Sequence, residues 1–83
     1  NLPTIKIKKN EIAKGINILD LVLLTKLGGS KGDVRRMIKN NGLKINNENI
    51  KNENKVIHEN NFDQTGSLKV SHGKKQHVIV KII

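Results

Sequence analysis

The chain has 83 residues and no cysteine, and its 16 Lys and Arg residues against 7 Asp and Glu residues give a formal net charge of +9. A chain of this length forms one small domain that hides about 63% of its unfolded surface, which leaves no room for a deep catalytic pocket. The absence of cysteine excludes disulfide bonds and thiolate metal sites and suits a reducing, cytoplasmic environment. The excess of positive charge predicts a polyanionic partner, and nucleic acid is the first candidate.

The N-terminal residues predict an edge strand. Residues 4–8 alternate apolar and polar side chains directly after Pro3, which is typical of a short strand at the edge of a sheet. Residues 10–15 then form a polar connection with room for one helical turn. No segment reaches the roughly 20 apolar residues of a membrane span, so no membrane partner is expected.

The start of the chain indicates a piece of a longer protein. It begins at Asn1 without an initiator Met, and no basic segment followed by an apolar one marks a secretory signal. We therefore predict a linker with an edge strand over residues 1–16 and one structural unit over residues 17–83.

The first helix is predicted over residues 17–27. Asn17 can cap its start, and Gly28 is expected to end it. Its wide apolar face is formed by Ile18, Leu19, Val22, Leu23 and Leu27. Leu21 and Leu24 exceed what one face needs, so they either complete the core of this domain or contact a part of the parent protein.

The second helix is predicted over residues 31–41, with Gly42 as its C-terminal stop. Ser30 as N-cap and Asp33 three residues later form a short-chain variant of the capping box. Apolar residues at spacings of three and four predict a buried stripe, namely Val34, Met37 and Ile38. Cations four residues apart lie on one side of a helix. An outward arc is therefore expected to carry Lys31, Arg35, Lys39 and the neighbouring Arg36.

Beyond the second helix the apolar period changes to two, which predicts strands. Leu43 and Ile45 lead into a hairpin whose turn uses Asn46 and Asn47, because Asn tolerates the left-handed conformation. Further short strands are expected at residues 56–57, 68–71 and 78–82, the last one in the centre of the sheet. The predicted fold class is α+β, with two packed helices (about 17–27 and 31–41) against a small, mainly antiparallel sheet.

The motifs of catalysis and cofactor binding are missing from the sequence. Residues 28–32 read GGSKG, but a P-loop needs four residues between its glycines and Gly-Lys-Ser/Thr at the start of a helix. His58, His72 and His77 have no carboxylate partner at a helical spacing of four, which disfavours a zinc site. The carboxylates are scattered over loops and helix caps, so no acid–base pair is expected. We expect no catalytic residue, no metal and no cofactor in this chain, which is not an enzyme by itself.

The single aromatic residue, Phe62, separates two modes of nucleic-acid binding. Proteins that read single strands stack the bases on several aromatic side chains, and this chain cannot build such a platform. Phe62 is therefore expected in the core. Cations on a rigid helix favour recognition of the backbone of a folded or double-helical RNA.

Two segments resemble a known RNA-binding module. Residues 30–39, SKGDVRRMIK, and residues 42–46, GLKIN, are similar to the RNA-binding domain named after the fourth small-subunit ribosomal protein. That family's pattern is S-K-x-E-A-R-R-L-I-K, a short turn, and G-V-x-V-N. Asp33 and Val34 depart from the pattern without removing a cation. Segments at residues 2–4, 54–56 and 73–81 further resemble the C-terminal domain of bacterial-type tyrosyl-tRNA synthetase, so the resemblance covers nearly the whole chain.

The resemblance implies an appended tRNA-binding domain with the αL motif of that ribosomal family. It implies a parent protein that is a cytoplasmic, homodimeric tyrosine–tRNA ligase, whose separate catalytic domain carries ATP and tyrosine. In such a protein this domain grips the tyrosine tRNA between the anticodon stem and the variable arm. The domain on its own is expected to be a monomer without a cofactor.

The resemblance also assigns RNA-binding roles by position. Phosphate contacts are implied for Lys31, Arg35, Arg36 and Lys39, with Ser30 near a phosphate at the helix start. Lys44 and Asn46 would line the adjoining strand, although Asn46 serves the hairpin turn equally well. Lys74 and Lys75 complete the set of candidate RNA-binding residues.

Two alternatives stay open at this point. One is the same module in another RNA-binding protein, such as a pseudouridine synthase, a ribosome-associated heat-shock protein or a ribosomal protein. The other is a basic protein-interaction domain, in which the first helix binds a partner and the lysines reflect A/T-rich codons.

Overall fold

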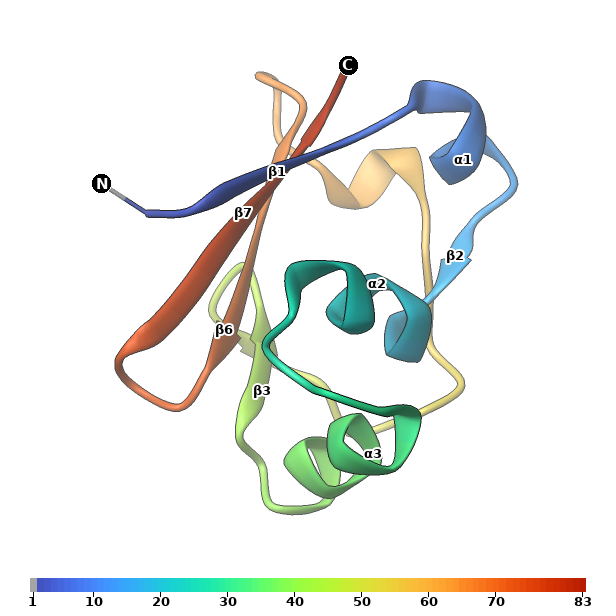
Figure 1. Ribbon diagram of the computed structural model, residues 1–83. Coiled ribbons are helices and arrows are strands. Elements are labelled where there is room, and N and C mark those ends of the chain that lie inside the picture. Colours follow the sequence, from blue (N-terminus) through green and yellow to red (C-terminus); the bar gives the residue numbers. More distant parts are fainter. Residues whose placement is uncertain (1) are drawn as a thin grey trace.

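A five-stranded sheet forms one side of the molecule in the computed structural model, which describes residues 2–83 (Figure 1). In spatial order its strands are β1 (Thr4–Ile7), β7 (Gln76–Ile82), β6 (Ser67–His72), β3 (Leu43–Ile45) and β4 (Glu48–Asn49). β1 runs parallel to β7, and the other neighbours are antiparallel. The mainly antiparallel sheet and the edge position of β1 confirm the predictions. β7 has a neighbour on each side, but it is the second strand and β6 is the middle one, so the prediction that the last strand lies in the centre was wrong by one strand.

A second, two-stranded sheet was not predicted. β2 (Ile16–Asn17) pairs antiparallel with β5 (Val56–Ile57), of which only β5 was expected. The short helix α1 (Lys9–Ala13) precedes β2, and the 3-10 helix η1 (Glu59–Asn61) follows β5. A strand of two residues is too short to show a period in the sequence. Its partner strand lies far away in the chain, so only the fold brings the two together.

Helix α2 (Ile18–Thr25) ends two residues before the predicted boundary. Asn17 caps its start as expected, since the side-chain oxygen accepts a hydrogen bond from the Leu19 amide at 2.8 Å. Lys26, with φ of 63°, ends the helix in the left-handed conformation, so Gly28 is not the terminator. Leu21 is fully buried and Leu24 is 46% exposed, so only Leu21 completes the core of this domain.

Helix α3 (Lys31–Lys39) starts at the predicted N-cap, where Ser30 Oγ accepts a hydrogen bond from the Asp33 amide at 3.1 Å. It also ends two residues early. Asn41, with φ of 58°, takes the left-handed position, and the Gly42 amide donates to the Met37 carbonyl at 2.8 Å. This is a Schellman ending with Asn in the place where glycine is usual.

The core lies between the five-stranded sheet and the pair α2 and α3, which share one side of the sheet in Figure 1. The predicted stripe on α3 is buried, and Phe62 is only 8% exposed, as expected. Asn46 and Asn47 both have positive φ, 52° and 70°, which confirms the tight hairpin between β3 and β4. Nowhere in residues 2–83 does a helix have the length and apolar character to cross a membrane.

Candidate nucleic-acid interface

The outward side of α3 carries the predicted cations. Val34, Met37 and Ile38 are at most 6% exposed, so the inner side of the helix is fixed against the core. The side chains of Lys31, Arg35 and Arg36 are 56%, 52% and 73% exposed, and Lys39 is exposed as well. The structure therefore brings these four residues together on one exposed arc of a short, rigid helix.

Three of these cations lie beside carboxylates. Lys31 Nζ is 3.6 Å from Asp20 Oδ1 of α2, and Arg35 Nε is 3.2 Å from Glu53 Oε2. Each of these pairs is about half exposed on both sides, and exposed ion pairs contribute little to stability. Water and salt screen such pairs, so a phosphate group can replace the carboxylates at little cost.

The third pair is internal to α3, where Arg36 donates a hydrogen bond to the Asp33 carboxylate. This contact, more than any other, holds the pKa of Asp33 below its ordinary value of 3.8. The backbone of Gly29 and the hydroxyl of Ser30 act in the same direction. Asp33 therefore stays ionised in the first turn of α3, where a negative charge suits the helix dipole.

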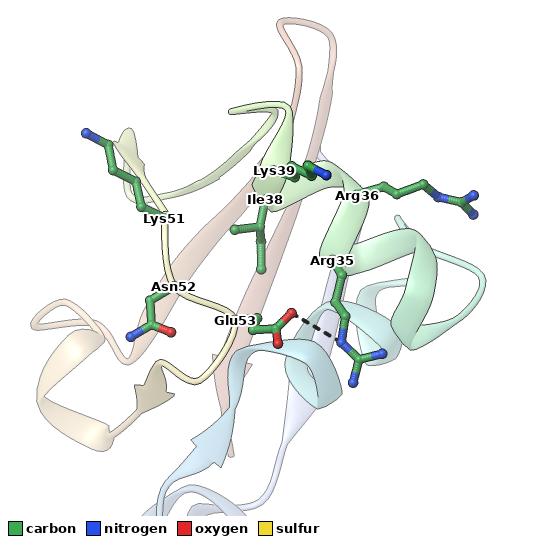
Figure 2. Close-up of a pocket in the computed structure, with 7 residues that line it drawn as sticks. All are labelled: Arg35, Arg36, Ile38, Lys39, Lys51, Asn52 and Glu53. Atoms are coloured by element: carbon green, nitrogen blue, oxygen red, sulfur yellow. Dashed lines mark ion pairs between the residues drawn. The ribbon is translucent and has the colours of Figure 1, made fainter.

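A groove runs beside α3 with a volume of about 410 Å³ (Figure 2). Arg35, Arg36, Ile38 and Lys39 line it from the helix, and Lys51, Asn52 and Glu53 from the segment after β4. In Figure 2 the Arg36 and Lys51 side chains extend outward at opposite ends, whereas Arg35 turns toward Glu53. The arrangement is a two-sided basic groove with one carboxylate inside it.

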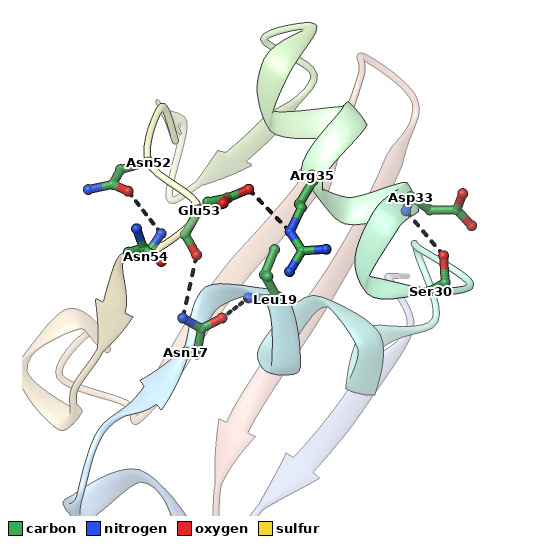
Figure 3. A network of polar contacts seen from close by, with 8 residues as sticks. All are labelled: Asn17, Leu19, Ser30, Asp33, Arg35, Asn52, Glu53 and Asn54. Carbon is green, nitrogen blue, oxygen red and sulfur yellow. Dashed lines mark hydrogen bonds and ion pairs between the residues drawn. The ribbon is translucent and has the colours of Figure 1, made fainter.

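Sequence reasoning missed the wall formed by Lys51, Asn52 and Glu53. Long-range contacts place the segment, because Asn17 Nδ2 donates to the Glu53 carbonyl at 3.4 Å (Figure 3). The Ile18 amide also donates to the Lys55 carbonyl at 2.9 Å. Within the segment, Asn52 Oδ1 accepts from the Asn54 amide at 2.9 Å. The exposed polar residues carried no periodic signal that pointed to α3.

The side chain of Asn46, in the turn between β3 and β4, bonds to η1 and β6. Its Nδ2 donates to the Asn61 carbonyl at 3.1 Å, and its Oδ1 accepts from the Lys69 amide at 3.0 Å. Both ends of the carboxamide are therefore engaged within the protein, which supports the structural reading of this residue.

Lys44 is not brought together with the α3 cations. Its neighbours Leu43 and Ile45 are buried toward the helices, and side chains alternate along a strand, so Lys44 lies on the opposite face of the sheet. Lys74 and Lys75 are exposed in the turn between β6 and β7. That turn lies near the end of α3, because the Gly73 amide donates to the Gly42 carbonyl at 2.8 Å.

The residues described offer no metal centre, since no three His, Cys, Asp or Glu side chains within residues 2–83 gather in a way that could hold an ion. The chemistry of this surface is that of guanidinium, ammonium and carboxamide donors facing solvent. Such donors bind phosphate oxygens by charge and hydrogen bonding.

Comparison with known proteins gives one family over almost the whole chain. The family model described as tyrosine–tRNA ligase SYY-like C-terminal domain matches residues 1–80. A tyrosine–tRNA ligase of Pelagibacter ubique (strain HTCC1062) is 47% identical over 83 residues, and one of Acetivibrio thermocellus is 36% identical over 83 residues. A tyrosine–tRNA ligase of a Wolbachia species from Drosophila simulans is 40% identical over 81 residues. These alignments cover 98–100% of this chain but only 20% of each relative, so the chain spans about a fifth of their length.

Proposed function

Because the chain belongs to the tyrosine–tRNA ligase SYY-like C-terminal domain family, we propose that it is the tRNA-binding module of a tyrosine–tRNA ligase. The module holds the backbone of tyrosine tRNA between the anticodon stem and the variable arm. A separate catalytic part of the parent protein binds ATP and tyrosine and forms the ester. In this proposal the module positions the tRNA and performs no chemistry.

The observation that carries the proposal is the exposed arc of cations on α3. Lys31, Arg35, Arg36 and Lys39 project from a helix whose other side is fixed in the core. Because the helix is anchored, the cations are held in place before RNA binds. Lys51 on the far side of the groove adds a cation that reaches the same phosphate backbone from the other direction.

Binding then proceeds by exchange of partners. A phosphate that enters the groove meets Arg35 and Lys39 and displaces the Glu53 carboxylate from Arg35. The condensed cations of the RNA are released at the same time, and this release drives association at low salt. Contacts of this kind fix the orientation of the RNA but do not recognise its base sequence. Selectivity therefore comes from the shape of the folded tRNA.

A salt titration with a tyrosine tRNA transcript tests the proposal. If four to six phosphates are neutralised, log affinity falls against log salt with a slope of roughly −3.6 to −5.4. Charge reversal at Arg35 (Arg35→Glu) is expected to weaken binding at least tenfold and to leave the thermal midpoint nearly unchanged. Lys14→Glu, at an exposed position beside α1, is the matched control.

Three results would contradict the proposal: a flat salt response, equal effects of the two reversals, or no binding even at low salt. The last result would favour the protein-interaction alternative. A large loss of stability in Arg35→Glu would instead mean that Arg35 serves the fold through Glu53.

A further inference from the structure

The face of the five-stranded sheet turned away from α2 and α3 carries a line of lysines. Ile45, Val70 and Val80 are buried toward the helices, so the residues that alternate with them face outward. Each of four adjacent strands contributes one lysine to this face: Lys6 on β1, Lys81 on β7, Lys69 on β6 and Lys44 on β3. We call these four residues the lysine row.

The strand register places the row in a line across the sheet. Lys6 is the direct partner of Lys81, on neighbouring strands about 4.8 Å apart. Lys81 lies opposite Ser67, and Lys44 lies opposite Ser71. Lys69 is two residues from each of these serines on β6, so it is the diagonal neighbour of both Lys81 and Lys44. Diagonal neighbours are about 7–8 Å apart, so the four lysines form a continuous line across four strands.

The row lacks internal compensation. Among residues 2–83 no carboxylate forms an ion pair with any of its lysines. Asp63 is close enough to Lys81 to be influenced by its charge, but its Oδ1 already accepts hydrogen bonds from Thr65 and Ser67. Like charges directly opposite each other, as in Lys6 and Lys81, destabilise a sheet.

Protection of the sheet edge does not explain the row. Lysines on edge strands prevent sheets from pairing with other chains, and Lys6 on β1 can serve that purpose. Lys69 and Lys81, however, lie on β6 and β7, which have a neighbour on each side. An anion bound across the row would compensate the repulsion between these lysines, and this explains a line of like charges on internal strands.

We propose that the lysine row is a second phosphate-binding surface, which takes the sugar-phosphate backbone of an RNA segment distinct from the one held by α3. A nucleic-acid backbone presents charges in a regular succession, which a line of cations across four strands matches. The row lies on the opposite side of the sheet from the α3 groove, so the two surfaces engage RNA independently. This assignment also gives Lys44 a role on the face where the structure places it.

Titration of the domain with a short RNA duplex of about one helical turn, too short to reach both faces, tests the proposal at low salt. The wild-type domain is expected to bind two duplexes per chain. The triple variant Lys6→Gln, Lys69→Gln, Lys81→Gln is expected to bind one, as is the groove variant Arg35→Gln, Lys39→Gln. The control variant Lys9→Gln, Lys14→Gln, Lys26→Gln removes the same charge from other exposed positions and is expected to keep both sites. Thermal midpoints establish that each variant is folded.

The outcomes separate this inference from the proposed function. One duplex per wild-type chain, lost in the groove variant and kept in the row variant, would overturn the lysine row and leave the tRNA-binding proposal intact. The reverse pattern would support the row and contradict the role of α3. Equal loss of duplex binding in the row and control variants would mean that only net charge matters. Binding to anionic lipid vesicles in place of RNA would assign the row to a membrane surface. Either result would overturn the inference.

Discussion

Helices α2 and α3 have nearly the same length, 8 and 9 residues, and pack against each other, yet they are built for different tasks. α2 buries most of its residues and has one charged side chain, Asp20. α3 buries only Val34, Met37 and Ile38 and turns its cations outward. In this small domain one helix supplies hydrophobic burial, and the other is anchored by three residues and presents charge.

This difference between the two helices implies that stability and the proposed RNA binding can be altered separately. A change on the buried side of α2 should lower the free energy of unfolding. It should leave unchanged the affinity for RNA of the molecules that remain folded. A change on the outer arc of α3 should do the opposite. The Lys31–Asp20 pair joins the two helices at the surface, but both side chains are more than half exposed, so this pair is a weak coupling.

The largest effect is expected for Leu21→Ala in α2. Leu21 is fully buried, and truncation of a buried leucine costs about 2 to 5 kcal/mol of unfolding free energy. Leu24→Ala makes the same substitution in the same helix at a side chain that is 46% exposed, so it is expected to change stability by about 0.5 kcal/mol or less. Urea unfolding measures both, and equal losses would contradict the one-sided burial of α2.

A smaller effect is expected at the start of α3. Ser30→Ala removes the acceptor for the Asp33 amide, which costs about 1 kcal/mol, within a range of about 0.5 to 2. Ser30→Thr keeps a hydroxyl acceptor and an extended N-cap conformation, so it is expected to retain most of the stability. If the alanine and threonine variants unfold at the same urea concentration, the cap does not stabilise α3.

Much of the fold, including the difference between α2 and α3, could be predicted from the sequence. α3 was predictable because a capping serine, apolar spacings of three and four, and cations four apart all agree. The Asn46–Asn47 turn and the alternation along β7 were equally local signals. The helix ends were wrong by two residues because Lys26 and Asn41, not glycines, take the left-handed positions. These are single-residue conformations that periodicity does not report.

The parts of the site that were missed depend on contacts between distant residues. Glu53 reaches Arg35 because Asn17, 36 positions away in the chain, holds its carbonyl. The face on which Lys44 lies follows from the burial of Leu43 and Ile45, and its place in the lysine row follows from the register of β3 against β6. A sequence predicts which residues carry charge, but strand pairing decides which charges meet.

A substitution at Glu53 tests the outer arc of α3 by an expected gain, not a loss, of affinity for tRNA. Glu53→Gln removes the carboxylate that occupies Arg35, so we expect tRNA to bind about threefold more tightly, the order of effect of an exposed ion pair. The segment is expected to keep its place, because its contact with Asn17 uses the backbone of Glu53. Glu11→Gln in α1 makes the same charge change away from the groove and serves as control. Equal affinity of the two variants would mean that Arg35 does not meet phosphate.

The smallest effect concerns the first turn of α3 in acid. The pKa of Asp33 is lowered from 3.8 in the folded domain, so its ionised form stabilises the fold fully above pH 3.8, and this contribution is lost as the pH falls further toward the folded-state pKa. Asp33→Asn removes the contribution at every pH. The wild type is therefore expected to be more stable than Asp33→Asn by a constant margin near neutral pH, and the margin is expected to narrow below pH 3.8. Urea midpoints across this range measure it, and a margin that stays constant in acid would mean that the Asp33 charge, and with it the Arg36 contact, does not stabilise α3.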